Sequence, residues 1–342
     1  MLDEINRKKG KMKKVTVRQG CKIILIFLAF ALFSCQPANQ KTDISLLEIV
    51  YSGTYKEVKR AIANGADVNE KNDIGQTPLM LSFLNRDKKI HKLLINSGAD
   101  VNAISSKGWT PLFYATEIRA DLILDTIKLL IKTGADLEYK NPSGQTPLAC
   151  AAEINKNDKV IELLINLGAN IDAENNIGIT PLFYAILNNT TETVALLIKH
   201  GADVNTVNED NQTPLIYAAG RKKEESNDII KLLLAAGVDV NIPDSYGATP
   251  LLYAIAENHD FEILKEIIQK VTNINYADVD GLTPLMAASI FTNNSELILY
   301  LLERGADPHI RDAEGKTAGD YIMENPTLRN SDAYRKLVFN LG

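Results

Sequence analysis

Histidine and cysteine, the side chains that most often bind zinc and related metals, are few in this chain of 342 residues. The chain contains four histidines and three cysteines, which are His91, His200, His259 and His309 with Cys21, Cys35 and Cys150. A metal site needs several such side chains together, for example two histidines four residues apart on a helix. No two histidines have that spacing, and none lies beside a cysteine.

The sequence also lacks a Gly-x-Ser-x-Gly nucleophile turn and a phosphate-binding loop. We therefore expect no catalysis, no cofactor, no metal ion and no small-molecule substrate. Each histidine is expected to lie at the surface or at a helix end. We expect Cys150 to be a small buried residue, since free cysteine is among the most buried residue types.

The amino-terminal stretch and the rest of the chain carry opposite charges. Residues 1–34 hold eight Lys or Arg and two acidic residues, a net charge of +6, so the remainder carries −12 of the total −6. Binding to nucleic acid depends mainly on Lys and Arg that neutralise phosphates. The acidic remainder therefore argues against nucleic acid as a partner, and equally against an anionic membrane surface as a partner of the folded part.

Cys35 ends a segment whose composition is typical of protein export. Residues 1–22 are basic, and Ile23–Phe33 is an unbroken run of 11 apolar residues. Such a run is too short to cross a bilayer, which takes about 20 residues, but it suits the core of a secretory signal. The run leads into Leu32-Phe33-Ser34-Cys35, which resembles the lipobox of bacterial lipoproteins.

The lipobox resemblance implies that the chain is cut before Cys35, which then carries the lipid. Residues 1–34 would form the signal peptide, and residues 35–42 a polar, lipid-anchored tether. This arrangement implies a protein of the bacterial cell envelope that is anchored to a membrane and faces the periplasm or the cell surface. Two other interpretations stay open: an ordinary cleaved signal, and an uncleaved anchor that contains a cysteine by chance. Met12 is an alternative start.

From about residue 43 onward the chain repeats one motif. Thr-Pro-Leu recurs at intervals of 33 to 36 residues, beginning at Thr77, Thr110, Thr146, Thr180, Thr213, Thr249 and Thr283. A period of this length predicts a stacked repeat array. In each copy the threonine, for example Thr180, can cap a first helix whose first residue is the proline. A glycine such as Gly201 then ends the second helix in a left-handed conformation.

The motif closely resembles the ankyrin repeat, whose signature Thr-Pro-Leu-His-x-Ala and 33-residue period it matches. The resemblance implies an all-α repeat solenoid over residues 43–342, built from helix-turn-helix units with β-hairpin-like fingers. It comprises an amino-terminal cap, seven full repeats and a carboxy-terminal cap. The signature histidine is replaced in every full copy, by Met80, Phe113, Ala149, Phe183, Ile216, Leu252 and Met286. We expect apolar packing to replace the polar tie that this histidine makes in the family.

Differences between the copies lead to three further predictions. Val271 replaces the helix-ending glycine in the copy at Thr249, and a β-branched residue resists the left-handed conformation, so we expect an altered helix exit there. The copies at Thr110 and Thr213 are longer near residues 118–121 and 220–226, where we expect loops. The predicted core leucines of the second helices are Leu197 and its counterparts Leu94, Leu164 and Leu302.

Seven large side chains are the candidate protein-binding residues. Trp109, Ile179 and Leu282 precede the repeat threonine, at a position that commonly lines the concave face in ankyrin proteins. Tyr114, Tyr184, Tyr217 and Tyr253 lie on the first helices, where they would half-face the same groove. Tyrosine and tryptophan are enriched among binding hot spots. The alternative interpretation is that these side chains only pack between repeats.

The ankyrin and lipobox resemblances together imply a membrane-tethered module that binds a protein partner on its concave surface. A second interpretation is an immunity or inhibitor protein, because an acidic surface would suit a basic toxin and speed association. A third is an accessory partner of an exported enzyme such as a catalase. An enzyme with a cryptic site would need clustered histidines or a basic cleft, and the sequence shows neither.

Overall fold

The computed structural model describes residues 45–85, 87, 89–118, 123–154, 157–188 and 190–339. The predicted signal peptide, the lipidation site Cys35 and the tether lie outside these residues. The described chain divides into an amino-terminal unit that ends at Asn176 and a carboxy-terminal unit that begins at Ile177.

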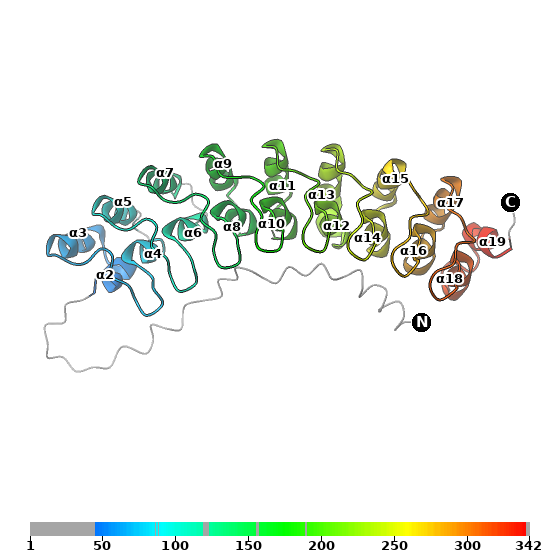
Figure 1. Cartoon of the computed structure of the whole chain (residues 1–342), viewed down its shortest axis with the longest axis horizontal. Coiled ribbons are helices and arrows are strands. Elements are labelled where there is room, and N and C mark those ends of the chain that lie inside the picture. The colour runs from blue at the N-terminus through cyan, green and yellow to red at the C-terminus, as the bar shows by residue number, and fades with distance from the viewer. Residues whose placement is uncertain are drawn as a thin grey trace. The chain divides into compact units, whose positions relative to one another are not determined.

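The amino-terminal unit consists of helix pairs in which each first helix is followed by a turn and a second helix. The helices are α2 (Leu46–Ser52), α3 (Tyr55–Ala63), α4 (Pro78–Ser82), α5 (Lys89–Asn96), α6 (Pro111–Thr116), α7 (Leu124–Lys132), α8 (Pro147–Ile154) and α9 (Asp158–Asn166). The first helices α2, α4, α6 and α8 contact one another in one row, and the second helices α3, α5, α7 and α9 form a second row (Figure 1).

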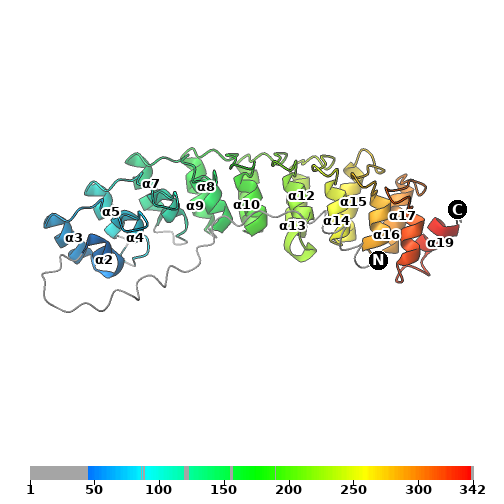
Figure 2. The same ribbon diagram turned by 60° about the horizontal axis from the view of Figure 1, so that its bottom comes forward.

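The carboxy-terminal unit follows the same plan. Its helices are α10 (Pro181–Asn188), α11 (Thr191–Lys199), α12 (Pro214–Ala219), α13 (Lys223–Ala235), α14 (Pro250–Ala256), α15 (Phe261–Lys270), α16 (Pro284–Phe291), α17 (Ser295–Glu303), α18 (Ala318–Glu324) and α19 (Asp332–Phe339). Contacts join α10, α12, α14, α16 and α18 into one row, and α11, α13 and α15 lie along a second (Figure 1). Figure 2 shows α12, α14 and α16 beside α13, α15 and α17. These repeating contacts explain how single repeats, which are too small to hold a core alone, become stable.

The repeat threonines cap their helices in some copies and not in others. The side-chain oxygens of Thr77, Thr146, Thr213 and Thr283 accept the amide three residues later at 3.2 to 3.4 Å. The predicted cap at Thr180 is wrong. The hydroxyls of Thr180 and Thr110 are buried without a hydrogen-bond partner in the described chain, and that of Thr249 makes no cap bond. In these three copies the amide four residues after the threonine lies 3.3 to 3.4 Å from the threonine carbonyl. The same distance is 2.9 to 3.1 Å in the capped copies, so the first turn is more open where the cap is missing.

The helix exits confirm the glycine prediction and the predicted exception. Gly201 follows α11 with φ of +92°, in the left-handed region that a side chain would resist. Val271 after α15 is instead extended, with φ of −69° and ψ of 129°. Its amide donates to the Ile268 carbonyl, and the Thr272 amide donates to Asn241 Oδ1 at 2.8 Å. The exit of α15 is therefore altered, as expected.

The core confirms the apolar replacement of the signature histidine and corrects one leucine. All seven replacements, which are Met80, Phe113, Ala149, Phe183, Ile216, Leu252 and Met286, are at most 1% exposed. Leu94, Leu164 and Leu197 are fully buried. Leu302 is only half-buried, and Leu301 is the fully buried counterpart, because it stands four residues before its helix-ending glycine as the other three do.

One predicted loop is partly helical. Residues from Lys223 onward form the first turn of α13, which has 13 residues where α11 has nine. The inserted residues therefore lengthen the second helix at its amino-terminal end, where Ser226 Oγ donates to the Lys222 carbonyl at 3.2 Å. Of the other insertion, Ile118 is described, and residues 119–122 lie outside the described residues.

Candidate protein-binding surface

The fingers between successive helix pairs are held in shape by side chains. At most of the tips an Asn, Asp or Ser side chain accepts one or two backbone amides further along the turn. Asp244 Oδ1, for example, accepts the amides of Tyr246 at 2.9 Å and Ala248 at 2.8 Å. The same paired bonds occur at Asn72, Asn141, Asn208, Asp278 and Asp312. Side-chain acceptors of this kind favour turns over strands, and no strand is present in the described residues.

Backbone hydrogen bonds also join neighbouring fingertips into a row. In the carboxy-terminal unit the amides of Glu209, Ser245, Val279 and Ala313 donate to the carbonyls of Ile177, Asp210, Tyr246 and Asp280 at 2.8 to 3.2 Å. The amino-terminal unit contains equivalent bonds from Ser106 to Ile74 and from Asn176 to Ser143. The tips are therefore fixed before any partner arrives, which lowers the entropy cost of binding.

The three candidate residues that precede the repeat threonine are buried. Trp109 is 6% exposed, Ile179 is fully buried and Leu282 is 1% exposed. Trp109 packs in a cluster with Phe113 and Cys150. The Leu282 amide donates to the fingertip Asp278 at 2.8 Å, a bond that folds the finger back onto the helices. The expected exposure of these residues is wrong, because a finger closed in this way directs the following side chain into the core.

Three of the four candidate tyrosines are also buried, and two of them contact the acceptor side chains of the fingers. Tyr253 Oη donates to Asp244 Oδ2 at 2.7 Å, and Tyr217 Oη accepts Asn208 Nδ2 at 3.0 Å. Burial raises the pKa of Tyr217 to about 12, and burial together with the Asp244 carboxylate raises the pKa of Tyr253 further. These tyrosines therefore hold fingertip acceptors in place.

Tyr184 is likewise buried, at 3% exposure. Tyr114 is half-buried, and its hydroxyl accepts Gln76 Nε2 of the preceding finger at 3.0 Å. Of the seven candidates, only Tyr114 keeps a surface that a partner could touch in the free protein. The packing alternative thus describes the other six in this structure.

The apolar side chains that do reach solvent gather on the fingers. Eleven large apolar side chains of the described chain are more than about a third exposed, and seven of them belong to fingers. The seven are Ile74, Ile104, Ile177, Val207, Tyr246, Tyr276 and Val279, of which Val279 is the most exposed at 67%. Exposed apolar surface commonly marks an interaction site where it is concentrated, and five of the seven side chains lie on the fingers of the carboxy-terminal unit. The corresponding signal in the sequence is the presence of apolar residues at turn positions, and these residues were not among the seven candidates.

Two carboxyl groups lie at the ends of the neighbouring first helices α6 and α8. Glu153 at the end of α8 is 6% exposed, and its Oε2 accepts Gln145 Nε2 at 2.7 Å. Glu117 follows α6, and its Oε1 is buried without a partner in the described chain. Burial raises the pKa of each carboxyl group to about 7. Lys107 opposes the shift at Glu117, and Glu153 adds to it.

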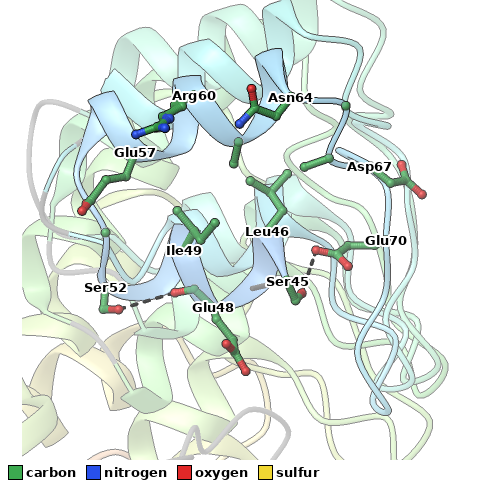
Figure 3. A pocket seen from close by; sticks show the side chains of 14 residues that line it. Ser45, Leu46, Glu48, Ile49, Ser52, Glu57, Arg60, Asn64, Asp67 and Glu70 are labelled. Atoms are coloured by element: carbon green, nitrogen blue, oxygen red, sulfur yellow. Dashed lines mark hydrogen bonds between the residues drawn. The ribbon is translucent and has the colours of Figure 1, made fainter. Parts of the chain in front are cut away.

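A hollow of about 890 Å³ lies between α2 and α3 at the start of the described chain (Figure 3). Its acidic side chains bind groups of their own repeat. Glu57 accepts the Thr54 amide at 2.7 Å, which lowers the pKa of Glu57, and Glu70 accepts Ser45 Oγ at 2.8 Å. A polar outer face of this kind is what an end repeat needs.

Two histidines tie repeats together, contrary to the expectation of surface positions. His259 is 4% exposed, and its ring nitrogens lie 3.0 Å from the Ala219 carbonyl and 2.6 Å from Asn227 Oδ1. Burial lowers the pKa of His259. His91 is 2% exposed, and its ring nitrogens lie 3.0 Å from the Ser82 carbonyl of its own repeat and 3.4 Å from Thr126 Oγ1 of the next repeat. Among the described residues, no three His, Cys, Asp or Glu side chains come together as metal ligands would.

Comparison with known proteins decides the family. The family model "Ankyrin repeats (3 copies)" matches residues 46–140, 118–208, 154–244 and 221–312. The chain belongs to the ankyrin-repeat family. Its fold is similar to the ankyrin-repeat domain of Bcl-3, a member of the IκB protein family, with a TM-score of 0.57 and 27% identity over 67% of this chain and 99% of that one.

A curated relative of this ankyrin-repeat protein is the mitochondrial disaggregase of Homo sapiens, 36% identical over 63 residues. The match covers 18% of this chain and 9% of the human protein, so the chain spans only a small part of that protein's length. Within the described ranges, every helix falls short of the length and apolar character that crossing a membrane requires.

Proposed function

We propose that this ankyrin-repeat protein is a membrane-tethered, non-catalytic module that binds a protein partner through the exposed side chains of its fingers. Ankyrin repeats generally mediate protein–protein interaction, and the chain carries them over residues 46–312. The observation that carries the proposal is the gathering of exposed apolar side chains on the fingers. Apolar area held on a fixed frame favours binding because little conformational entropy is lost.

The experiment is site-specific photo-crosslinking in the native cell. A photoreactive residue at Tyr246 or Val279, both on fingertips, should give a discrete cross-linked partner. The same residue at Met323 serves as the matched control, because Met323 is 42% exposed but lies on α18. Equal products at all three positions, or none at the fingertips, would remove the support for the finger surface.

The tether is supported by the sequence before the first repeat. The basic stretch, the 11 apolar residues and Leu32-Phe33-Ser34-Cys35 fit a lipoprotein signal with Cys35 as the first residue of the mature chain. A Cys35→Ser variant should lose fatty-acid labelling and leave the membrane fraction. Unchanged membrane association with an intact amino terminus would favour the uncleaved anchor instead.

The immunity or inhibitor interpretation draws support from charge. The chain beyond residue 34 carries a net charge of −12, which would attract a basic toxin and speed its association at low salt. Under this interpretation the cross-linked partner is a toxin, and the chain should protect cells that produce it. Failure to protect would leave only the general binding role.

A further inference from the structure

The fingertips of the carboxy-terminal unit form a surface that we call the fingertip ridge. It consists of Ile177, residues 209–210, 245–246, 279–280 and 313–314. In each bond between successive tips, a backbone amide of the later tip donates to a backbone carbonyl of the earlier one. Those backbone groups are already hydrogen-bonded. A partner would therefore contact mainly the side chains of the ridge and would not add a strand to it.

The side chains of the ridge combine two chemistries. Ile177, Tyr246 and Val279 expose 38%, 37% and 67% of their surface. The acidic residues are Glu209, Asp210, Asp280 and Glu314, and the ridge contains no lysine or arginine. The apolar Tyr246 follows the acidic tip 209–210, and Val279 shares its tip with Asp280, so the ridge mixes apolar and acidic side chains.

The two basic residues of the last finger contact groups of their own repeat. Lys316 Nζ pairs with Glu324 Oε1 at 3.2 Å, and Arg311 Nη1 donates to the Gly315 carbonyl at 2.6 Å. Glu209 and Asp210 are exposed, and within the described chain neither side chain makes an ion pair. A partner that supplies positive charge would therefore meet the carboxylates of Glu209 and Asp210, which form no ion pair within the described chain.

We propose that the fingertip ridge binds an extended polypeptide segment that carries apolar side chains flanked by lysine or arginine. This inference rests on the proposed function and names the chemistry of its partner. Packed helices lie about 8–10 Å apart, and an extended chain advances about 3.3 Å per residue. Successive fingers therefore meet about every third residue of the segment, with apolar residues at Tyr246 and Val279.

The acidic residues on either side of Tyr246 and Val279 determine where basic residues should lie in the bound segment. Glu209 and Asp210 precede Tyr246 along the row, and Asp280 and Glu314 accompany and follow Val279. A segment with a basic residue at each end and two apolar residues about three apart between them matches this order. Rim charges of this kind act mainly on the association rate, which falls as salt rises.

The test selects binders from a random library of twelve-residue peptides displayed on phage, with the whole chain as bait. The account expects enriched peptides with a net positive charge and two apolar residues about three positions apart. Enrichment of acidic or purely polar peptides, or no enrichment at all, would overturn it.

Two variants then locate the binding. One double variant is Glu209→Lys with Asp210→Lys, and the other is Tyr246→Ser with Val279→Ser. Each should lower the affinity for a selected peptide by about tenfold or more, because the first loses charge contacts and the second loses apolar contacts. Met323→Ser is the matched control and should leave affinity unchanged. All of these side chains are exposed, so thermal stability should stay near that of the wild type. Equal affinity for the ridge variants and the wild type would overturn the assignment.

Two outcomes separate this inference from the proposed function. Cross-linking at 246 and 279 to a partner whose contacted segment is not basic would overturn the inference and leave the binding role intact. Self-association of the chain that disappears in the Tyr246→Ser, Val279→Ser variant would assign the ridge to a second copy, and so overturn the inference as well.

Discussion

Replacing Glu153 by glutamine should stabilise this protein above neutral pH. The carboxyl group is buried, and its pKa rises from 4.5 to about 7 because burial penalises the charged form. Gln145 Nε2 donates to it at 2.7 Å, a bond that a glutamine oxygen can also accept. Glu153→Gln keeps the shape and removes the charge that must otherwise form in the core.

The direction of the pH dependence follows from the raised pKa. Between about pH 4.5 and about pH 7 the folded protein binds more protons than the unfolded chain at this group. Glu153 therefore contributes most to the free energy of unfolding below about pH 4.5. That contribution is lost as the pH rises through about 7, and it does not change at higher pH. The rise of the pKa from 4.5 to about 7, at about 1.4 kcal/mol per pKa unit, gives an upper limit of about 3–4 kcal/mol. We expect about 1–2 kcal/mol, because surroundings relax around a buried charge.

The assay is urea unfolding of the whole chain at about pH 5 and about pH 8, on either side of the raised pKa. Trp109 is the only tryptophan and packs in the neighbouring repeat, so its fluorescence reports on this region. Glu162→Gln, an exposed change on α9, is the matched control. A Glu153→Gln variant with the wild-type difference between the two pH values, or one destabilised at the higher pH, would refute the reasoning.

Three further predictions concern stability and local opening. Leu197→Ala should lower the free energy of unfolding by about 2–5 kcal/mol, because Leu197 is fully buried. Tyr253→Phe should cost about 1–3 kcal/mol in urea unfolding, because it leaves the buried Asp244 carboxylate without its phenol donor. Hydrogen exchange should be faster in residues 269–275 than around Gly201, because α15 ends without a left-handed glycine.

Matched changes check these three predictions. Leu196→Ala on the half-buried face of α11 should cost less than Leu197→Ala, and equal costs would mean that the buried face is misassigned. Tyr246→Phe alters an exposed tyrosine, so a loss as large as that of Tyr253→Phe would argue against the hydrogen-bond explanation. Exchange at residues 269–275 no faster than at the glycine exit would argue against a weakened helix end.

The repeat architecture could be predicted because it depends on local signals. Proline at the first helical position and glycine at the helix exit act through their own backbone preferences, and a 33-residue period repeats them. The altered helix exit at Val271 could be predicted for the same reason. The start of α13 could not be predicted, because the inserted charged residues suit a loop and a helix equally well.

The burial of the candidate site residues depends on contacts that no periodic pattern shows. Trp109 and Leu282 turn inward because their fingers close through side-chain acceptors several residues earlier. Tyr253 faces Asp244 nine residues away, and His259 reaches Ala219 forty residues away. Such pairs are set by the stacking of repeats, so the sequence indicated large side chains but not which of them reach solvent.

The most direct measurement compares two double variants in melting temperature and in capture of the cross-linked partner. Tyr246→Ser with Val279→Ser removes exposed fingertip side chains, and Trp109→Ala with Tyr184→Ala removes buried ones. The account predicts that the fingertip variant loses capture and keeps its melting temperature. The buried variant should melt lower and still capture the partner at temperatures where it stays folded. Capture lost only in the buried variant, with its melting temperature preserved, would contradict the account and return the site to Trp109 and Tyr184.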